Sequence, residues 1–452
     1  MIGFIFLYMI AQVLIGIWAS KKIKSEKDFL VAGRNIPSLL LVFSLFSTWF
    51  GAETIMGTSG EVYRHGLAGS RADPLGYSLC LLILGLLVAG KLWHKDYYTL
   101  GDFFRDRFGK KTEQLVILIL FVSSLIWASA QIRAFGQIFS HYSQLPLWLT
   151  MTLGFGLVVI YSLLGGLLGD ILTDFIQGIV LLLGLVILLV LVLSTVNFSE
   201  SSPLVPPSQL SWTLPDESFW HRLERWTIPI LGSLIAQESI SRILSCRDKN
   251  QAKSVPLYAA AVYLVAGSIP VLLGLVGPKI LPDLSDHEQF IIKMADSLLP
   301  HWALMMFIGA LVSAILSTVD SILISGGGLI SHNYLIPRLA IQRENHKLFL
   351  TRLSVITMAS VAFVIALTSD GIYELVELAS SWGSSGLVIV TLFGLWTSLG
   401  SSREANITLL VGVFSLVTFR ELLNLTTPYL ASLGLSAITF LILSHFFRSK
   451  RT

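Results

Sequence analysis

The chain has 452 residues, of which 54% are hydrophobic and 13% are charged, and its formal net charge is +3. A soluble domain of this length would carry far more charge, so the composition predicts an integral membrane protein. The small positive excess concerns the loops and gives no indication of nucleic-acid binding. The two cysteines, Cys80 and Cys246, lie in or beside apolar runs, which argues against a disulfide framework or a metal cluster.

Apolar runs long enough to cross a membrane recur along the whole chain. Each is about 20 residues long, which fits helices rather than the shorter alternating strands of a barrel. The first run lacks a basic start and a small-residue cleavage site, so we interpret it as a retained helix and not as a signal peptide. Hydrophobic periodicity predicts about 13 spans, at roughly 2–20, 37–61, 74–93, 113–139, 147–166, 171–195, 226–245, 255–278, 295–330, 349–369, 373–399, 405–422 and 427–446.

The second span contains a stretch, Ser44 to Tyr63, whose residues interrupt a helix. Gly51 and Gly57 are weak helix formers, and Glu53 would be a charge at membrane depth. A backbone that unwinds there must line a protein cavity, where freed carbonyls can coordinate a cation. The alternative is a kinked helix whose small residues pack against its neighbours.

A second interrupted stretch is expected from Ser313 to Ser325, where hydroxyls alternate with apolar residues around Asp320. Ser317 and Ser321 lie one helical turn apart and therefore share a face. Hydroxyls from this stretch and carbonyls from the first make a plausible sodium site, because small hard cations prefer oxygen ligands. Alternatively, the hydroxyls only join neighbouring helices.

The distribution of Lys and Arg predicts the topology. One set of alternate loops collects most of them, including Arg242 and the segment His94 to Gly109, whereas the other set has few, Arg71 among them. By the positive-inside rule the first set is cytoplasmic, and so is the C-terminal segment Arg448 to Thr452. The N-terminus and the polar loop Asn197 to His221 are then outside, in a multi-pass protein of the cell membrane.

Three acids, Glu53, Glu238 and Asp320, lie inside predicted spans, and Arg133 is the one basic residue expected well within a span. Arg133 and Asp320 are possible charge partners, since unpaired charges are expensive at that depth. Arg133 could instead hold a substrate carboxylate. The sequence has no Ser-His-Asp set, phosphate loop or paired catalytic carboxylates, and its histidines have no ligand spacing, so we expect no enzyme activity.

Several short motifs are spread along most of the chain. They are AGR at Ala32, TWFG at Thr48, GTSGEVY at Gly57, TLGDFFRDRFG at Thr99, GG at Gly165, TDFIQ at Thr173 and LSTVDS at Leu316. Together these motifs resemble the sodium:solute symporter family. Within that family the high-affinity choline transporters look most similar, through Trp49, the run from Asp73 to Leu87, Trp127 and SRILS at Ser241 to Ser245.

The resemblance implies one all-α transporter domain over residues 1–452 with a LeuT-type 5+5 core, two inverted repeats of about five helices each. The core would cover about residues 37–399, with an extra N-terminal helix at 2–20 and peripheral helices at 405–446. The two broken helices would be the span around Gly51 and the span from Pro229 to Glu238, which Pro229 and Gly232 weaken.

The resemblance also implies site residues. In the sodium site, Ser47, Phe50 and Ala314 would supply carbonyl oxygens, and Ser317 and Thr318 hydroxyls. Asp174 matches an acid on the inward sodium route, although an ordinary acid at a helix start is an alternative. Ala236 stands where a further cage tryptophan is expected, which leaves the aromatic cage incomplete. The substrate-binding residues implied are Trp49, Glu53, Tyr77, Trp127, Ala236 and Glu238.

We therefore expect a sodium-coupled secondary active symporter that imports a small organic solute by alternating access. The solute would be a choline-like ammonium or a zwitterion, because a desolvated cation gains about 2 kcal/mol from each good contact with an aromatic face. An organic acid, an amino acid or a sugar is the alternative cargo. A transporter-derived membrane sensor or receptor is the alternative of a different class. The expected partners are the solute, Na+ and the lipid bilayer.

Overall fold

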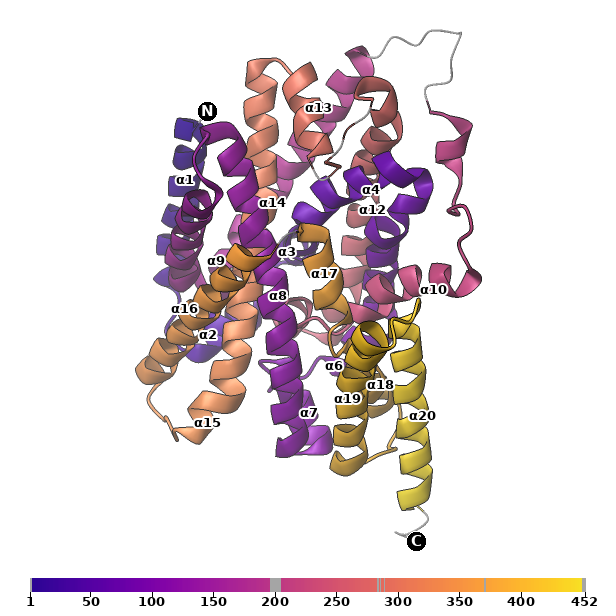
Figure 1. The fold of residues 1–452 in the computed structure, drawn as a ribbon. Helices are drawn as coiled ribbons and strands as arrows, with labels where there is room; N and C mark the ends of the chain where they lie inside the picture. Colours follow the sequence, from indigo (N-terminus) through magenta and orange to yellow (C-terminus); the bar gives the residue numbers. More distant parts are fainter. Residues whose placement is uncertain are drawn as a thin grey trace.

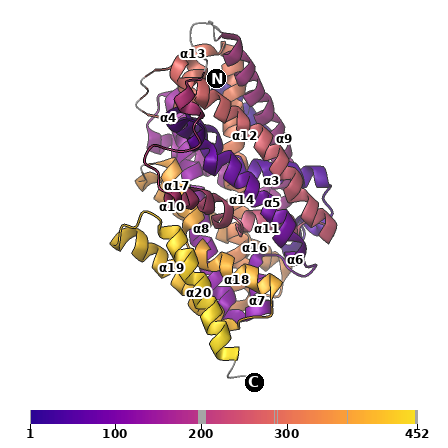
Figure 2. The same ribbon diagram turned by 90° about the vertical axis from the view of Figure 1, so that its right-hand side faces the viewer.

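The computed structural model describes residues 2–195, 205–282, 284, 286–287, 289–369 and 371–448. The described residues form helices joined by short connections, without a β-strand. Two views at right angles show a tall bundle in which most helices run along its long axis (Figures 1 and 2). The predicted all-α class is therefore confirmed.

The helices differ widely in length. The first half of the chain forms α1 (Ile2–Ser20), α2 (Glu26–Val31), α3 (Ser38–Trp49), α4 (Thr58–His65), α5 (Tyr77–Ile83), α6 (Gly90–Leu92), α7 (Leu100–Phe108), α8 (Lys110–Ser143) and α9 (Leu147–Thr195). The second half forms α10 (Phe219–Thr227), α11 (Gln237–Leu244), α12 (Lys249–Ile280), α13 (Phe290–Leu298), α14 (His301–Ile330), α15 (Ile336–Arg338), α16 (Glu344–Thr368), α17 (Ile372–Ser381), α18 (Ser384–Trp396), α19 (Ser402–Val417) and α20 (Pro428–Arg448).

Nine helical stretches of the described chain are long and apolar enough to cross a membrane, or ten if the bent pair Glu26–Arg34 and Ser38–Trp49 counts as one span. The sequence predicts about 13 spans. The difference arises where predicted spans correspond to shorter or broken helices, at 2–20, 147–166 and 226–245, and where 37–61 and 74–93 meet in the stretch Glu53–Leu92. Leu183, Val364 and Ile442 lie exposed on α9, α16 and α20, as lipid-facing side chains would.

The predicted interruption near Gly51 is present. Helix α3 ends at Trp49, Phe50 leaves the helical region with φ −85° and ψ 66°, and a π-helical turn, Glu53–Gly57, leads into α4. A second break follows the π-helical turn Ile228–Gly232, because Ala236 is extended and caps α11. Both helices that the family resemblance implies to be broken are therefore broken.

The expected interruption from Ser313 to Ser325 is wrong. Helix α14 runs unbroken through it. The hydroxyls of this stretch donate to carbonyls of their own helix, from Ser313 to Gly309 at 2.7 Å and from Ser325 to Ser321 at 2.7 Å. Such bonds satisfy a hydroxyl without opening the helix. A run of serines is therefore compatible with an unbroken helix.

A turn at the paired glycines divides α9. Gly166 has φ +50° and ψ −161°, a backbone conformation that side-chain-bearing residues rarely adopt. The predicted spans 147–166 and 171–195 are the two parts on either side of this turn. Helix α9 as a whole packs against α1, α3 and α14.

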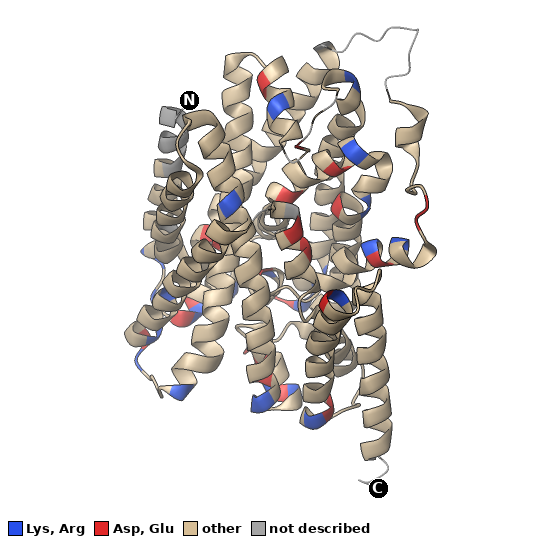
Figure 3. Ribbon diagram, viewed as in Figure 1, with Lys and Arg blue, Asp and Glu red and all other residues tan. Residues whose placement is uncertain are grey.

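Charged residues gather away from the apolar middle of most helices, as Figure 3 shows. Lys and Arg concentrate at the lower end in that view, where α8 begins and α15 and α19 have their ends. Helix α1 begins at the upper end and α20 ends at the lower one (Figure 1). Residues 197–204 of the predicted outer loop and 449–452 of the predicted cytoplasmic tail lie outside the described residues.

Candidate solute and sodium sites

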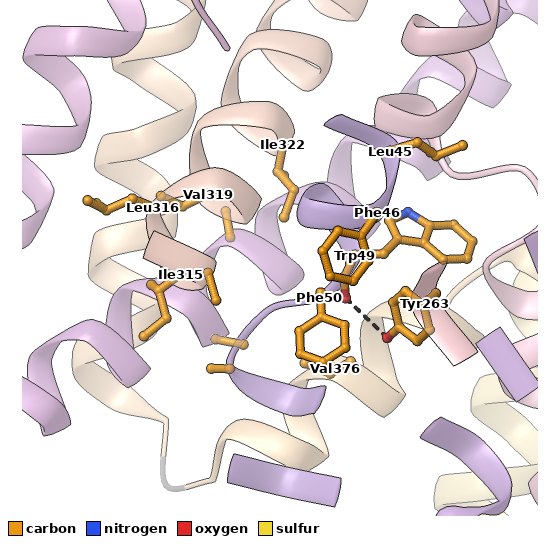
Figure 4. Close-up of a cluster of buried hydrophobic side chains, with 14 of the residues drawn as sticks. Leu45, Phe46, Trp49, Phe50, Tyr263, Ile315, Leu316, Val319, Ile322 and Val376 are labelled. Atoms are coloured by element: carbon orange, nitrogen blue, oxygen red, sulfur yellow. Dashed lines mark hydrogen bonds between the residues drawn. The ribbon is translucent and has the colours of Figure 1, made fainter. Parts of the chain in front are cut away.

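The candidate site lies where the broken α3 meets α14, α9 and α11. The last turn of a helix has carbonyls without an intrahelical partner, and the end of α3 at Trp49 exposes such carbonyls in the protein interior. In Figure 4, Leu316, Val319 and Ile322 of α14 lie on one side of this region, and Phe46, Trp49 and Tyr263 lie on the other. The unwound segment is thus enclosed by apolar side chains.

The structure brings two of the five residues predicted for sodium, Ser47 and Ser317, into contact with Asp174. Ser317 of α14 donates to Oδ1 of Asp174, and the Ser47 hydroxyl of α3 donates to the Asp174 carbonyl at 3.0 Å. Ser44 adds a bond to Oδ2 at 2.5 Å. Hydroxyl, carbonyl and carboxylate oxygens from three helices therefore converge, which is the ligand type that a small cation requires.

The other predicted sodium residues lie beside this group. Thr318 donates to the Ala314 carbonyl at 3.1 Å, which joins two of the predicted ligands within α14. A Cβ added to Gly51 would lie 2.9 Å from Oγ1 of Thr318, so only a glycine lets the unwound chain approach α14 this closely. Phe50, on the same unwound segment, is fully buried with its ring 5.3 Å from that of Tyr263.

Arg242 is a buried cation of the site and not a cytoplasmic loop residue. Its guanidinium is fully buried and pairs with Asp170 at 2.5 Å and with Asp174 at 3.1 Å. It also donates to Ser321. The expectation that Arg133 is the one basic residue within a span is therefore wrong. The positive-inside rule misplaced Arg242 because it treats each Lys and Arg near a span end as a loop residue. Arg242 instead lies on the short helix α11, which follows the break, and it points into the protein.

The predicted aromatic residues flank the same unwound segment. The Trp49 and Tyr77 rings have centroids 5.6 Å apart in an edge-on arrangement, and the Trp49 indole donates to Oε1 of Glu238 at 3.4 Å. On the other side, the Trp127 indole donates to Oε1 of Glu53 at 3.1 Å. Each predicted acid therefore accepts a bond from a predicted aromatic residue, which holds the ring in place.

A cavity of about 290 Å³ reaches this group, and Glu53, Asp73 and Tyr77 are among its lining residues. A smaller cavity of about 30 Å³ is lined by Trp127 and Ala236. Ala236 and Trp127 thus border the same small cavity. The larger cavity has five acids and three arginines in its lining, and so it carries an excess of negative charge.

The rim of the larger cavity is built from groups that the topology prediction places outside. Arg71, expected in an outer loop, is buried and pairs with Glu217 at 2.8 Å. Glu224 of α10 accepts backbone N–H bonds from Tyr429 and Leu430, each at 2.7 Å. Burial raises the pKa of the Glu224 carboxyl, and these two N–H bonds oppose the rise.

Neither Arg133 nor Asp320 lines one of the two cavities. The Arg133 guanidinium donates to the Ala366 carbonyl at 3.3 Å. Asp320 of α14 is buried, with one carboxylate oxygen that has no hydrogen-bond partner among the described residues. None of the ion pairs in the described part of the chain joins these two residues.

Sequence reasoning missed five polar residues of the site. Gln131 binds Glu53 at 2.7 Å, and Arg242 binds Asp174. Two of the missed residues had signals, because Asp170 stands one helical turn before Asp174 and Asp73 one turn before Tyr77, both in apolar surroundings. The missed residues are Asp73, Gln131, Asp170, Arg242 and Tyr263.

A fold of packed apolar helices with two central breaks and a buried polar site defines a multi-pass membrane transporter. The family model of the sodium:solute symporter family matches residues 29–412. The chain belongs to this family, and it is a sodium-coupled symporter of a small organic solute.

Individual relatives differ in what they carry. The chain is 25% identical over 428 residues to the high-affinity choline transporter 1 of Caenorhabditis elegans, covering 87% of this chain and 72% of that protein. It is 24% identical to a sodium/proline symporter of Haemophilus influenzae, covering 94% and 88%. A substrate-bound, outward-open Na+-coupled sialic acid symporter has the same fold, with a TM-score of 0.84, 16% identity and coverage of 98% and 95%.

Proposed function

We propose that this symporter uses the sodium gradient to import a solute with a positively charged ammonium group, either choline-like or zwitterionic. The ammonium would lie between Trp49, Tyr77 and Trp127, with Glu53 as its counter-charge. The observation that carries the proposal is the hydrogen bond from Trp127 to Glu53, because it places an aromatic face and a carboxylate side by side next to the acid-lined cavity. A cation gains from both.

The sodium ion would bind between the Ser47, Phe50 and Ala314 carbonyls and the Ser317 and Thr318 hydroxyls. Asp174 would receive the ion on its way to the cytoplasm, since it contacts Ser317 directly. A tenfold sodium gradient supplies about 1.4 kcal/mol and a potential of 100 mV about 2.3 kcal/mol. One ion can therefore support accumulation of a neutral solute by roughly several hundredfold.

The finer architecture belongs to the same proposal. About 13 spans would include the short and broken helices, with a 5+5 inverted-repeat core at about 37–399 and peripheral helices at 2–20 and 405–446. Residues 1–452 would form one transporter domain in the cell membrane, with the N-terminus outside and the C-terminus in the cytoplasm.

A second class of cargo is supported by observations of its own. Two relatives carry different solutes, choline in one and proline in the other, and Arg133 could serve an organic acid, an amino acid or a sugar if it turned from the Ala366 carbonyl to the cavity. A sensor that binds without transport is the remaining alternative.

A thermal-shift screen of the purified protein separates the cargo classes. Choline, betaine, amino acids, sugars and carboxylates would each be tested in sodium and in potassium. We expect stabilisation by an ammonium solute in sodium only. Uptake of that solute into proteoliposomes with an imposed sodium gradient then distinguishes a transporter from a sensor. Stabilisation by a carboxylate or a sugar alone would move Arg133 to the centre of the site.

A further inference from the structure

Gln131 of α8 contacts the broken helix directly after its break, in two places. Its side chain is fully buried, and both ends of its amide make a hydrogen bond. Nε2 donates to Oε2 of Glu53 at 2.7 Å, and Oε1 accepts the backbone N–H of Ala52 at 3.2 Å. One side chain therefore holds a carboxylate of the proposed solute site together with the backbone beside it.

The partners of the Gln131 amide fix its orientation. A backbone N–H can only donate, so the amide oxygen must face Ala52. The NH2 group is then directed at Glu53, whose Oε2 accepts. Turning the amide over would set two donors against each other at Ala52, and a buried donor without an acceptor costs free energy. Both bonds therefore depend on this one orientation of the amide.

Trp127 holds the same carboxylate but not the backbone. It lies one helical turn before Gln131 on the same face of α8, and its indole donates to Oε1 of Glu53 at 3.1 Å. An indole has a single N–H and no acceptor, so this bond uses the whole hydrogen-bonding capacity of Trp127. Gln131 differs because it also binds Ala52. Comparing these two neighbours thus separates a contact with Glu53 from a contact with the backbone at the break.

The proposed sodium and solute sites meet at Gly51. A Cβ added there would lie 2.6 Å from Oε2 of Glu53, 2.9 Å from Oγ1 of Thr318 and 3.0 Å from Oε1 of Gln131. An acid of the solute site, a hydroxyl proposed for sodium and the Gln131 amide thus surround one glycine. Phe50, whose carbonyl is also proposed to bind sodium, directly precedes it. Any shift of the chain at the break therefore moves groups of both sites.

We infer that Gln131 is a positioning residue that couples sodium binding to solute binding. A helix start has backbone N–H groups without an intrahelical acceptor, and Gln131 supplies one for Ala52 just after the break. A sodium ion bound at the Phe50 carbonyl fixes this part of the chain, and the amide transmits its position to the Glu53 carboxylate. Coupling is reciprocal, so a solute held at Glu53 raises the sodium affinity by the same factor. This inference rests on the proposed function, because it links the two ligands of that function.

Sodium binding without an organic solute gives the first test. Gln131→Met keeps the approximate size of the side chain but removes both hydrogen bonds, so the break loses its anchor at Ala52. Titration of NaCl against thermal unfolding of the purified full-length chain, with KCl keeping the ionic strength constant, measures the sodium affinity. We expect a fall of about tenfold, as for other residues that orient a metal ligand. Trp127→Phe should keep the parent's sodium affinity, because the Trp127 indole donates only to Glu53.

Solute binding in two salts gives the second test. Isothermal titration measures the Kd of choline, betaine and proline in saturating NaCl and in KCl. Sodium should tighten binding to the parent by a factor of about 5–150, the usual range for coupled sites. Gln131→Met should reduce this factor towards one, whereas Trp127→Phe should weaken binding in both salts and leave the factor unchanged. A structural role of Gln131 alone would also weaken binding equally in the two salts.

Gln12→Met, the same exchange at a buried glutamine of α1, is the matched control and should behave like the parent in both tests. Gel filtration shows whether each variant is folded, and Gln131→Asn, whose amide is too short to reach both partners, replaces a Gln131→Met protein that does not fold. A sodium affinity equal to that of Gln12→Met, or an unchanged sodium effect on the Kd, would overturn the inference. Failure of all three solutes to bind the parent in sodium would refute the proposed function instead, and the sodium titrations would then decide the role of Gln131 by themselves.

Discussion

Trp127 donates its indole N–H to Oε1 of Glu53 across 3.1 Å, so a predicted aromatic wall and a predicted counter-charge form one unit. Gln131 fixes the other oxygen of Glu53 at 2.7 Å. The carboxylate is thus held by two neutral donors, and none of the ion pairs among the described residues includes it. Because Glu53 also lines the larger cavity, a solute can reach this unit from the side of α10.

Replacing Trp127 with Leu removes the aromatic face and should weaken binding of an ammonium solute. The expected loss is about 2 kcal/mol, roughly a 30-fold rise in Kd. Trp127→Phe is the matched variant, since it keeps an aromatic face but cannot donate to Glu53. Isothermal titration with the ammonium compound found by screening measures both. An unchanged Kd in Trp127→Leu would show that Trp127 only packs, and Arg133 would become the next residue to test.

Removing both hydroxyls in Ser317→Ala with Thr318→Ala should weaken apparent sodium affinity by at least about tenfold, as the loss of ligand-shell groups commonly does. Ser325→Ala is the control on the same helix, because its hydroxyl is buried and bonds only within α14. Sodium-dependent uptake into proteoliposomes measures the effect. Identical sodium curves for the double variant and the parent would remove these hydroxyls from the sodium site.

Arg242 should be required for stability. In Arg242→Gln the carboxylates of Asp170 and Asp174 lose their shared cation, and breaking a buried pair costs about 3–5 kcal/mol. Combining Arg242→Gln with Asp170→Asn removes one of the two stranded charges and should restore part of the loss. The midpoint of thermal unfolding in detergent measures both the loss of stability and its partial recovery. A double variant no more stable than Arg242→Gln would indicate that Arg242 acts through its other partners.

The break in α3 could be predicted from sequence because several weak helix formers and an acid occur together in an apolar span. The family resemblance also implied roles for Ser47, Ser317 and Asp174 in the same sodium pathway, and these residues do meet, although Ser47 does so through its hydroxyl and not its carbonyl. The break expected in α14 was wrong for a physical reason. A serine can bond to the carbonyl of its own preceding turn, and the sequence does not distinguish that bond from one to a neighbouring helix.

The inward position of Arg242 could not be predicted from position along the chain. It lies near the end of the predicted span 226–245, where an arginine usually faces the cytoplasmic side, and only the packing of α11 against α3 and α14 turns it towards Asp170. The contacts among Thr54, Asp73 and Tyr263 could not be predicted for the same reason. Thr54, Asp73 and Tyr263 come from three separate segments, and only the tertiary structure joins them.

The orientation in the membrane can be tested by cysteine labelling, because both native cysteines are buried and should not react with the label. Asp96→Cys places a thiol on an exposed residue of the predicted cytoplasmic segment His94 to Gly109, and Ser208→Cys places one in the predicted outer loop. Six Lys and Arg residues lie within 91–111, and such an excess favours retention of a loop in the cytoplasm. An impermeant maleimide added to intact cells should therefore label Ser208→Cys, and it should label Asp96→Cys only after permeabilisation. Labelling of Asp96→Cys in intact cells would invert the topology and with it the side from which the larger cavity fills.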